Sequence, residues 1–152
     1  MQFGQLNRTD TEKIYIVCQN VAGATLSAGA AVFFTNPITG ADADTTKVSG
    51  ARTSMARLFA GVLPSALSDS SYGLVQVYGL ASCYIVLSDT GASAIPGDGL
   101  LAVNSQTYLV DFSAISTPSK EYENWVTLMD YYSAAAGGQS TPLLKQVLVR
   151  AL

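Results

Sequence analysis

The sequence contains no histidine, and it has only two cysteines and one tryptophan among its 152 residues. Without histidine, the Ser-His-Asp and Cys-His nucleophilic schemes, histidine-ligated zinc and the usual proton shuttle near neutral pH are excluded. Neither a phosphate-binding Gly-x-x-x-x-Gly-Lys motif nor a dinucleotide-binding Gly-x-Gly-x-x-Gly motif occurs. We therefore expect a protein that is not an enzyme, and name no catalytic, cofactor-binding or metal-binding residue.

Charged residues are also scarce. Asp, Glu, Lys and Arg make up 12% of the chain, against about 25% in an ordinary soluble domain. Eight basic and eleven acidic residues give a net charge of −3, so we do not expect the basic patch with which proteins bind nucleic acid. Apolar residues make up 49%, and few charges remain to cover the surface. We therefore expect a homodimer or homotrimer that buries part of this surface.

Long apolar runs are missing as well. The longest uncharged stretches, residues 14–41 and 70–88, are interrupted by Asn, Gln, Gly and Pro, whereas a membrane-spanning helix needs about 20 predominantly apolar residues. The segment up to Lys13 is polar and mixed in charge, unlike a secretory signal. We expect no membrane association and a cytosolic site of synthesis, where Cys18 and Cys83 would be buried free thiols.

What the sequence does contain is a series of short apolar runs, about every ten residues, between clusters of Gly, Pro, Ser, Asn and Asp. No segment keeps helical periodicity over three turns. This pattern predicts a single-domain all-β fold, a β-barrel or β-sandwich of about nine short strands, with an N-terminal arm at residues 1–13 and the β domain at residues 14–152. The predicted strands are residues 14–18, 31–35, 57–63, 74–78, 83–87, 100–103, 108–112, 126–132 and 146–150.

The turns and loops give further expectations. A glycine-containing turn before an apolar run recurs at residues 26–32, 70–75 and 95–100, an echo too loose to predict a true repeat. Residues 36–56 and 133–142 are expected to be surface loops. The strand at 74–78 is apolar on both faces, so we expect both to be covered, and we expect Tyr78 and Trp125 to be core aromatics.

Two acidic strings invite a catalytic interpretation. Asp89-Thr90-Gly91 resembles the loop of retroviral-type aspartic proteases, in which two copies share one proton between paired carboxylates. Asp42-Ala43-Asp44 shares residues with a phosphotransferase motif and with a calcium-binding loop. However, the buried strand that precedes the phosphotransferase motif and the terminal Glu of the calcium loop are both missing. We expect Asp89 to close a turn by bonding local backbone N–H groups, and the segment at 42–44 to be a solvated loop.

A resemblance extends in outline over most of the chain. Residues 20–32, with Gly23-x-x-Leu26-x-x-Gly29-x-x-Val32, resemble a corner of bacteriophage head decoration proteins, also called cement or capsid-stabilising proteins. Residues 60–62 with 72–79 are similar to the central hairpin of these proteins, and residues 99–101 and 145–152 to their late segments.

This resemblance implies a β oligomer bound to the outside of an icosahedral shell, where it bridges subunits of the major capsid protein. The chain would then be a virion protein of the capsid surface, assembled in the host cytoplasm. Three alternatives stay open: another virion component such as a tail or fibre-base protein, a carbohydrate-binding β domain using Trp125 and tyrosines, and an aspartic protease using Asp89.

The N-terminal arm generates a prediction. Its sparse apolar residues, Phe3 and Leu6, with Arg8 beside them, are expected to contact a partner. Fixing the backbone of such an arm costs about 1–2 kcal/mol per residue, so the arm becomes ordered only where a partner provides pockets for its apolar side chains. Deleting residues 1–8 should leave the melting temperature nearly unchanged but weaken binding to neighbouring subunits or to the shell. Unchanged assembly with a large loss of thermal stability would place the arm in the core instead.

Overall fold

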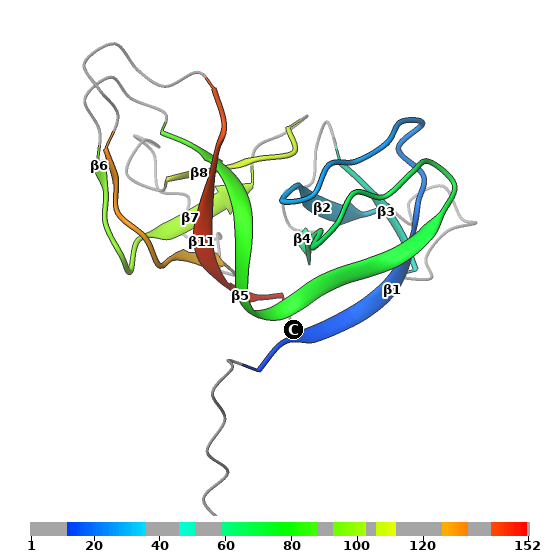
Figure 1. Cartoon of the computed structure of the whole chain (residues 1–152), viewed down its shortest axis with the longest axis horizontal. Helices are drawn as coiled ribbons and strands as arrows, with labels where there is room; N and C mark the ends of the chain where they lie inside the picture. The colour runs from blue at the N-terminus through cyan, green and yellow to red at the C-terminus, as the bar shows by residue number, and fades with distance from the viewer. Residues whose placement is uncertain are drawn as a thin grey trace, which may run out of the picture.

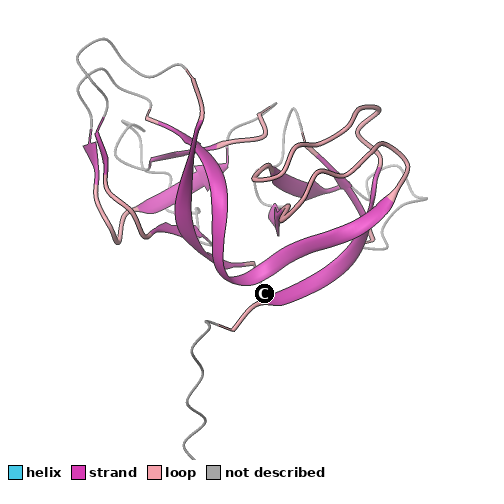
Figure 2. Ribbon diagram, in the orientation of Figure 1, coloured by secondary structure: helices cyan, strands magenta, loops and turns pink. Residues whose placement is uncertain are grey.

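The computed structural model describes residues 12–35, 46–50, 59–87, 93–102, 106–111, 126–133 and 141–151. Every regular element in these ranges is a β-strand (Figure 1, Figure 2), which confirms the all-β prediction. The strands are β1 (Ile14–Asn20), β2 (Ala31–Phe34), β3 (Lys47–Ser49), β4 (Phe59–Val62), β5 (Tyr72–Val86), β6 (Ser93–Ala94), β7 (Gly99–Ala102), β8 (Leu109–Asp111), β9 (Val126–Leu128), β10 (Tyr132–Ser133) and β11 (Leu143–Arg150).

Nine of these strands form one sheet that closes on itself twice. Its order is β1-β3-β2-β4-β5-β11-β9-β7-β8, with additional pairings of β1 to β5 and of β5 to β8. The pairing of β1 with β5 closes β1, β3, β2, β4 and β5 into a first barrel. The pairing of β5 with β8 closes β5, β11, β9, β7 and β8 into a second barrel. β6 and β10 pair separately. The long strand β5 therefore belongs to both barrels, and Figure 1 shows it curving from one to the other.

β5 continues through both barrels because Gly79 bends it. The φ angle of Gly79 is +99°, a conformation that residues with a Cβ rarely adopt. A Cβ here would also collide with the carbonyl oxygen of Glu12, which lies against the strand. The buried side-chain amide of Gln76 donates to the carbonyl oxygens of Tyr78 (3.2 Å) and Leu80 (2.9 Å), one on each side of the glycine. The bend thus leaves these carbonyl groups hydrogen-bonded.

The two barrels share one topology. In each, the first strand pairs in parallel with the third and antiparallel with the fifth. The second strand pairs antiparallel with the third and the fourth, and the fourth pairs antiparallel with the fifth. β5 is the fifth strand of the first barrel and the first strand of the second. The fold is therefore a tandem repeat whose two copies overlap in one strand.

The strand register agrees as closely as the topology. Six cross-strand pairs of the first repeat each have an equivalent pair in the second repeat. With the first-repeat pair given first, they are Cys18–Gly73 with Cys83–Lys145; Asn20–Val48 with Ile85–Leu109; Val32–Gly61 with Leu100–Val126; Phe34–Val48 with Ala102–Leu109; Val62–Gln76 with Thr127–Leu148; and Leu26–Leu67 with Ala94–Tyr132. Val48 corresponds to Leu109 through its first-strand partner and again through its second-strand partner. A one-residue shift would exchange inside for outside, so the match assigns each described strand position in one repeat an equivalent in the other.

The glycine turn before the second strand is repeated too. Gly29 and Gly97 both have positive φ angles, +80° and +105°, and each donates its N–H to the carbonyl oxygen of an equivalent leucine, Leu63 or Leu128, at 2.8 Å. The expectation that the echo at residues 26–32 and 95–100 is no true repeat is therefore wrong. The third occurrence, at residues 70–75, begins the fifth strand of the first repeat and is not equivalent.

The hydrophobic core also joins the barrels. One buried cluster lies within the first barrel and includes Cys18, Leu26, Val32, Val48, Leu63 and Val75. The larger cluster combines residues of the second barrel with Ala31, Phe33, Phe59 and Val62 from β2 and β4. Phe33 and Phe59 meet edge to face with ring centroids 6.1 Å apart, and burying one such side chain stabilises the fold by about 1.5–3 kcal/mol. The barrels therefore bury apolar surface against each other.

Several local predictions differ from the structure. The segments 74–78 and 83–87 belong to the single strand β5, since Gly79 bends the chain without ending the ladder. The predicted loop 36–56 contains β3, whose Val48 is fully buried. Leu74 and Tyr78 are 48% and 39% exposed while Gln76 between them is buried, so the outer face of that strand is only partly covered, and Tyr78 is not a core aromatic.

The bend in β5 gives a prediction about stability. Gly23 has a φ angle of +76° and open space where a Cβ would lie, so Gly23→Ala should cost only the backbone strain, about 1–2 kcal/mol. Gly79→Ala should cost at least about 3 kcal/mol, because the collision with the Glu12 carbonyl is added to the strain. Urea unfolding of both variants measures the difference. Equal losses would show that residue 12 moves aside freely and that the close approach does not constrain the bend.

Candidate functional site

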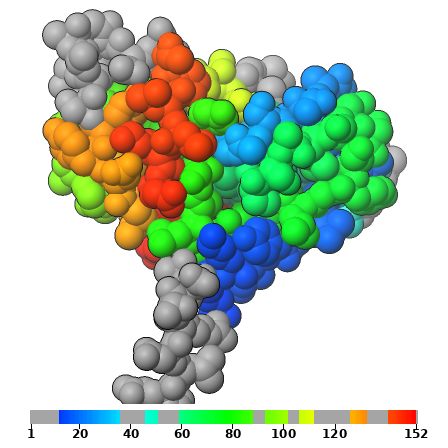
Figure 3. All heavy atoms as spheres, in the orientation of Figure 1, coloured from blue at the N-terminus to red at the C-terminus, as the bar shows by residue number. Residues whose placement is uncertain are grey.

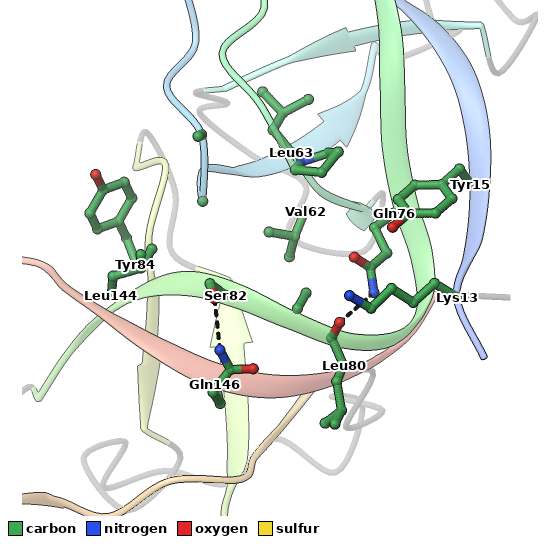
Figure 4. Close-up of a pocket in the computed structure, with 14 residues that line it drawn as sticks. Lys13, Tyr15, Val62, Leu63, Gln76, Leu80, Ser82, Tyr84, Leu144 and Gln146 are labelled. Carbon is green, nitrogen blue, oxygen red and sulfur yellow. Dashed lines mark hydrogen bonds between the residues drawn. The ribbon is translucent and has the colours of Figure 1, made fainter. Parts of the chain in front are cut away.

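A cleft of about 600 Å³ lies at the seam between the two barrels (Figure 4). Its walls come from both repeats and from the segment that enters β1. The lining residues are Lys13, Tyr15, Ala28, Gly29, Val62, Leu63, Pro64, Gln76, Leu80, Ala81, Ser82, Tyr84, Leu144 and Gln146. Most of them are apolar, and none is a carboxylate, a cysteine or a histidine. Of the groups used in nucleophilic or general-base catalysis, the lining has only Lys13, Ser82 and two tyrosines, and the Ser82 hydroxyl accepts a hydrogen bond from Gln146.

The amide side chains of the cleft already have partners within the fold. Gln76 bonds the backbone at the bend of β5, and Gln146 Nε2 donates to Ser82 Oγ at 2.9 Å. Figure 4 shows both amides along the floor, with Val62 and Leu63 on the wall formed by the first barrel. In the described part of the chain, no three His, Cys, Asp or Glu residues come together as metal ligands. The cleft is best described as an interface between the repeats.

The contacts at this interface show how one repeat docks on the next. The turn at Gly29 in the first repeat lies on the outer face of β5 and β11 in the second. The Gly29 carbonyl oxygen accepts a hydrogen bond from Tyr84 N at 2.9 Å, and Ala31 N donates to Thr107 O at 2.9 Å. A Cβ on Gly29 would lie 2.5 Å from Leu144 Cδ1 and 3.5 Å from Tyr84 Cδ2. A side chain at Gly29 would therefore require the Leu144 side chain to move.

A first exposed apolar surface, here named the strand face, consists of Tyr15, Val17, Tyr72 and Leu74. These side chains are 38%, 60%, 67% and 48% exposed. They lie on neighbouring strands, since Val17 pairs directly with Leu74 in the antiparallel ladder of β1 and β5. In Figure 3, β1 (blue) lies at the surface beside the first half of β5 (green). Such a group of large apolar side chains in contact with water is typical of an interaction site.

A second exposed apolar surface, named the turn face, consists of Ile95, Pro96, Gly97, Met129 and Tyr131. Ile95, Met129 and Tyr131 are 53%, 46% and 57% exposed. The turn is held by backbone bonds from Gly97 N to Leu128 O and from Asp98 N to Ile95 O, and by a bond from Ile95 N to the Asp98 carboxylate. These hydrogen bonds define the conformation of the turn although its side chains are in contact with solvent.

The two cysteines are equivalent positions of the repeat and are free, fully buried thiols, as the sequence predicts. Burial raises the pKa of Cys18 to about 11 and the pKa of Cys83 to about 12, from an ordinary value of 9.0. The folded state therefore holds these protons at a pH where the unfolded state has lost them. It follows that the stability due to the neutral thiols is present below pH 9 and is lost as the pH rises through 11 and 12.

The interface residues predicted from the sequence, Phe3, Leu6 and Arg8, lie outside the described residues. The aspartic-protease candidate Asp89 and the aromatic Trp125 lie outside them too, as do the acidic residues at 42–44 and most of the loop 133–142. The surfaces that the structure does show, the strand face and the turn face, were missed. Their signal in the sequence was apolar residues on both faces of one strand and an isoleucine beside a proline-glycine turn.

Comparisons with known proteins add one likeness. No family model matches the chain, and no curated protein matches it. Among solved structures, the fold is similar to the N-terminal base of the head fibre protein gp8.5 of bacteriophage phi29, with 14% sequence identity and a TM-score of 0.48 over 91% of this chain and 94% of that one. We draw no conclusion about function from this likeness. No helix among the described residues is long and apolar enough to cross a membrane.

The buried cysteines give a prediction that separates structural thiols from reactive ones. At pH 8 the raised pKa values leave about one thiol in a thousand or fewer as thiolate, and neither sulfur is exposed. Native protein should therefore show no reaction with Ellman's reagent on the timescale of minutes, and two thiols should react in urea. Rapid labelling of a native thiol would show that Cys18 or Cys83 is accessible and open to a chemical role.

Proposed function

We propose that the chain is a non-enzymatic structural protein of a bacteriophage particle. It binds the outside of the icosahedral capsid as a homo-oligomer and stabilises contacts between major capsid subunits. It needs no cofactor for this role and has neither nucleic acid nor membrane as a partner. The observation that carries the proposal is the pair of exposed apolar faces on a scaffold in which every described buried polar side chain has a hydrogen-bond partner.

The distribution of charge supports a role in assembly. With 19 charged residues in 152, the chain has little of the charge that keeps an abundant monomer dispersed. The strand face and the turn face add aromatic residues and methionine, which are enriched where proteins meet. Lys145 forms an ion pair with Asp130 at 3.4 Å beside the turn face. Burial of apolar surface, and not ion pairing, would dominate binding.

The architecture supports a bridging role as well. Two barrels that share a strand and a core form a rigid body, because separating them would break the β5 ladder and expose the larger buried cluster. A rigid body that touches two neighbouring subunits, and binds only when both are in place, stabilises the assembled shell by mass action. At a ligand concentration a hundred times the dissociation constant this contribution is about 2.7 kcal/mol per site. No chemistry is required for such a function.

Sedimentation with capsid shells tests the proposal. Purified protein should co-sediment with shells that lack it, saturate at a fixed ratio to the major capsid protein, and raise the melting temperature of the shell. Unassembled capsid subunits are the matched control and should bind much more weakly, because the bridged site exists only in the shell. Absence of saturable binding to shells would refute the proposal.

The same preparation distinguishes the tail or fibre-base alternative. Particles can be separated into heads and tails before the chain is quantified by mass spectrometry. We expect it in the head fraction at many copies. Recovery with tails, or at only a few copies per head, would support the alternative.

A further inference from the structure

We propose that copies of this chain associate head to tail, with the turn face of one copy docked on the strand face of the next. The partner is a second copy of the same chain. This inference deepens the homo-oligomer part of the proposed function and does not rest on capsid binding, since two chains can associate in this way whether or not a capsid is present.

The proposal follows from the equivalence of the two repeats. Within the chain, the Gly29 turn of the first repeat is docked on the β5–β11 face of the second. The equivalent of this turn in the second repeat is the Gly97 turn, at the centre of the turn face. The equivalent of the β5–β11 face in the first repeat is the β1–β5 face, which contains the strand face. Within the chain, the turn of the first repeat is therefore docked on the face of the second, and we call this the filled pair. The turn of the second repeat and the face of the first repeat are not docked on each other, and we call them the open pair.

On the turn side, exposure at equivalent positions agrees with an open pair, whereas on the strand side Leu144, the equivalent of Tyr72, is itself 53% exposed. A Cβ on Gly29 would meet Leu144 and Tyr84, whereas a Cβ on Gly97 would meet no atom within 4 Å. Ala31 is fully buried at the start of β2, while its equivalent, Gly99, is only partly buried. The second turn has the backbone conformation of the first, but among the described residues none packs against Gly97 in the way that Leu144 and Tyr84 lie against Gly29.

At two of the four strand-face positions and at two turn-face positions, the side chain is more apolar than its equivalent in the internal docking, whereas Tyr15 and Tyr72 occupy the places of Leu80 and Leu144. On the strand side, Val17 and Leu74 occupy the places of Ser82 and Gln146 in the second repeat. On the turn side, Ile95 and Met129 occupy the places of a serine and a proline, Ser27 and Pro64.

This difference indicates a contact between separate chains. The internal interface is held together by the shared strand and can carry polar residues. An interface between chains has no such connection and must compensate for the lost freedom of the two chains with apolar burial. Both open surfaces have the composition that this requires.

The two dockings differ in one respect. In the second barrel, Gly29 O and Ala31 N lie between Tyr84 N and Thr107 O, with one hydrogen bond to each. In the first barrel the equivalent groups, Gln19 N and Thr46 O, bond each other directly at 2.6 Å. Docking on the strand face therefore rests on its side chains and not on added backbone hydrogen bonds. A head-to-tail contact of this kind is heterologous, so an open assembly keeps one free face at each end until a ring closes.

Mixing two variants tests this arrangement. Leu74→Asp disables the strand face, and Ile95→Asp disables the turn face. Each should weaken self-association by about a hundredfold, since a charge would be buried without a partner. Both residues are exposed in the single chain, so the melting temperature should hardly change. Leu143→Asp is the matched control, because this leucine is similarly exposed (39%), lies outside both faces, and should leave assembly unchanged.

Sedimentation velocity of the full-length proteins at micromolar concentration gives the result. Wild type should sediment as an oligomer and each face variant as a monomer. An equimolar mixture of the two variants should form a complex of two chains and nothing larger, because one intact turn face and one intact strand face remain. A monomeric wild type, face variants that stay oligomeric, or a mixture that stays monomeric would each overturn the proposal.

Chemical cross-linking provides a second readout that does not depend on weakened binding. Tyr72→Cys and Pro96→Cys place one thiol on each face, while Cys18 and Cys83 are buried and should not compete. With a short bis-maleimide, the double variant should give multimers on a denaturing gel, and neither single variant should give more than a trace of dimer. Strong dimers from either single variant would show that like faces meet, which contradicts the head-to-tail contact.

Discussion

The bent strand β5 is the constraint on which the rest of this structure depends. Its first half completes the first barrel and its second half begins the next, so the two barrels cannot move independently without loss of ladder hydrogen bonds. The bend requires a glycine at position 79, where the chain takes a φ angle of +99° and the carbonyl of Glu12 approaches closely. Gln76 supports the bend by bonding carbonyl oxygens on both sides of it. A glycine and an amide thus connect local backbone geometry to the arrangement of the whole molecule.

A repeat that overlaps in one strand has consequences for association. Because the register is the same in both copies, the surface that accepts the first repeat within the chain has an equivalent on β1 and the first half of β5, on which none of the described turns is docked. Quasi-one-dimensional repeat proteins usually cover such ends with polar residues to stay soluble. Here Val17, Leu74, Ile95 and Met129 are apolar and exposed instead. Uncapped ends of this kind favour further docking, and a second copy supplies the complementary surface.

The sequence predicted the fold class but not the symmetry of the fold. Short apolar runs between turn residues are enough to indicate an all-β domain, and buried thiols followed from Cys18 and Cys83 lying in apolar runs. The repeat was missed because few side chains are shared: two glycines six residues apart, Gly23 and Gly29 in one copy and Gly91 and Gly97 in the other, are its main trace. Barrel closure joins strands distant in the chain, and a local pattern does not specify those pairings. The strand face and the turn face were missed for a related reason. Apolar residues alternate along a strand in the same way whether the face on which they lie is buried or exposed.

The central claim is that the two barrels form one cooperative unit through β5 and the shared core. Differential scanning calorimetry of the full chain tests it most directly, by comparing the calorimetric enthalpy of unfolding with the van't Hoff enthalpy. The account predicts one transition with a ratio close to one, measured at a concentration low enough to separate unfolding from dissociation. Two resolved transitions, or a ratio near two, would show that the barrels unfold independently and would contradict it.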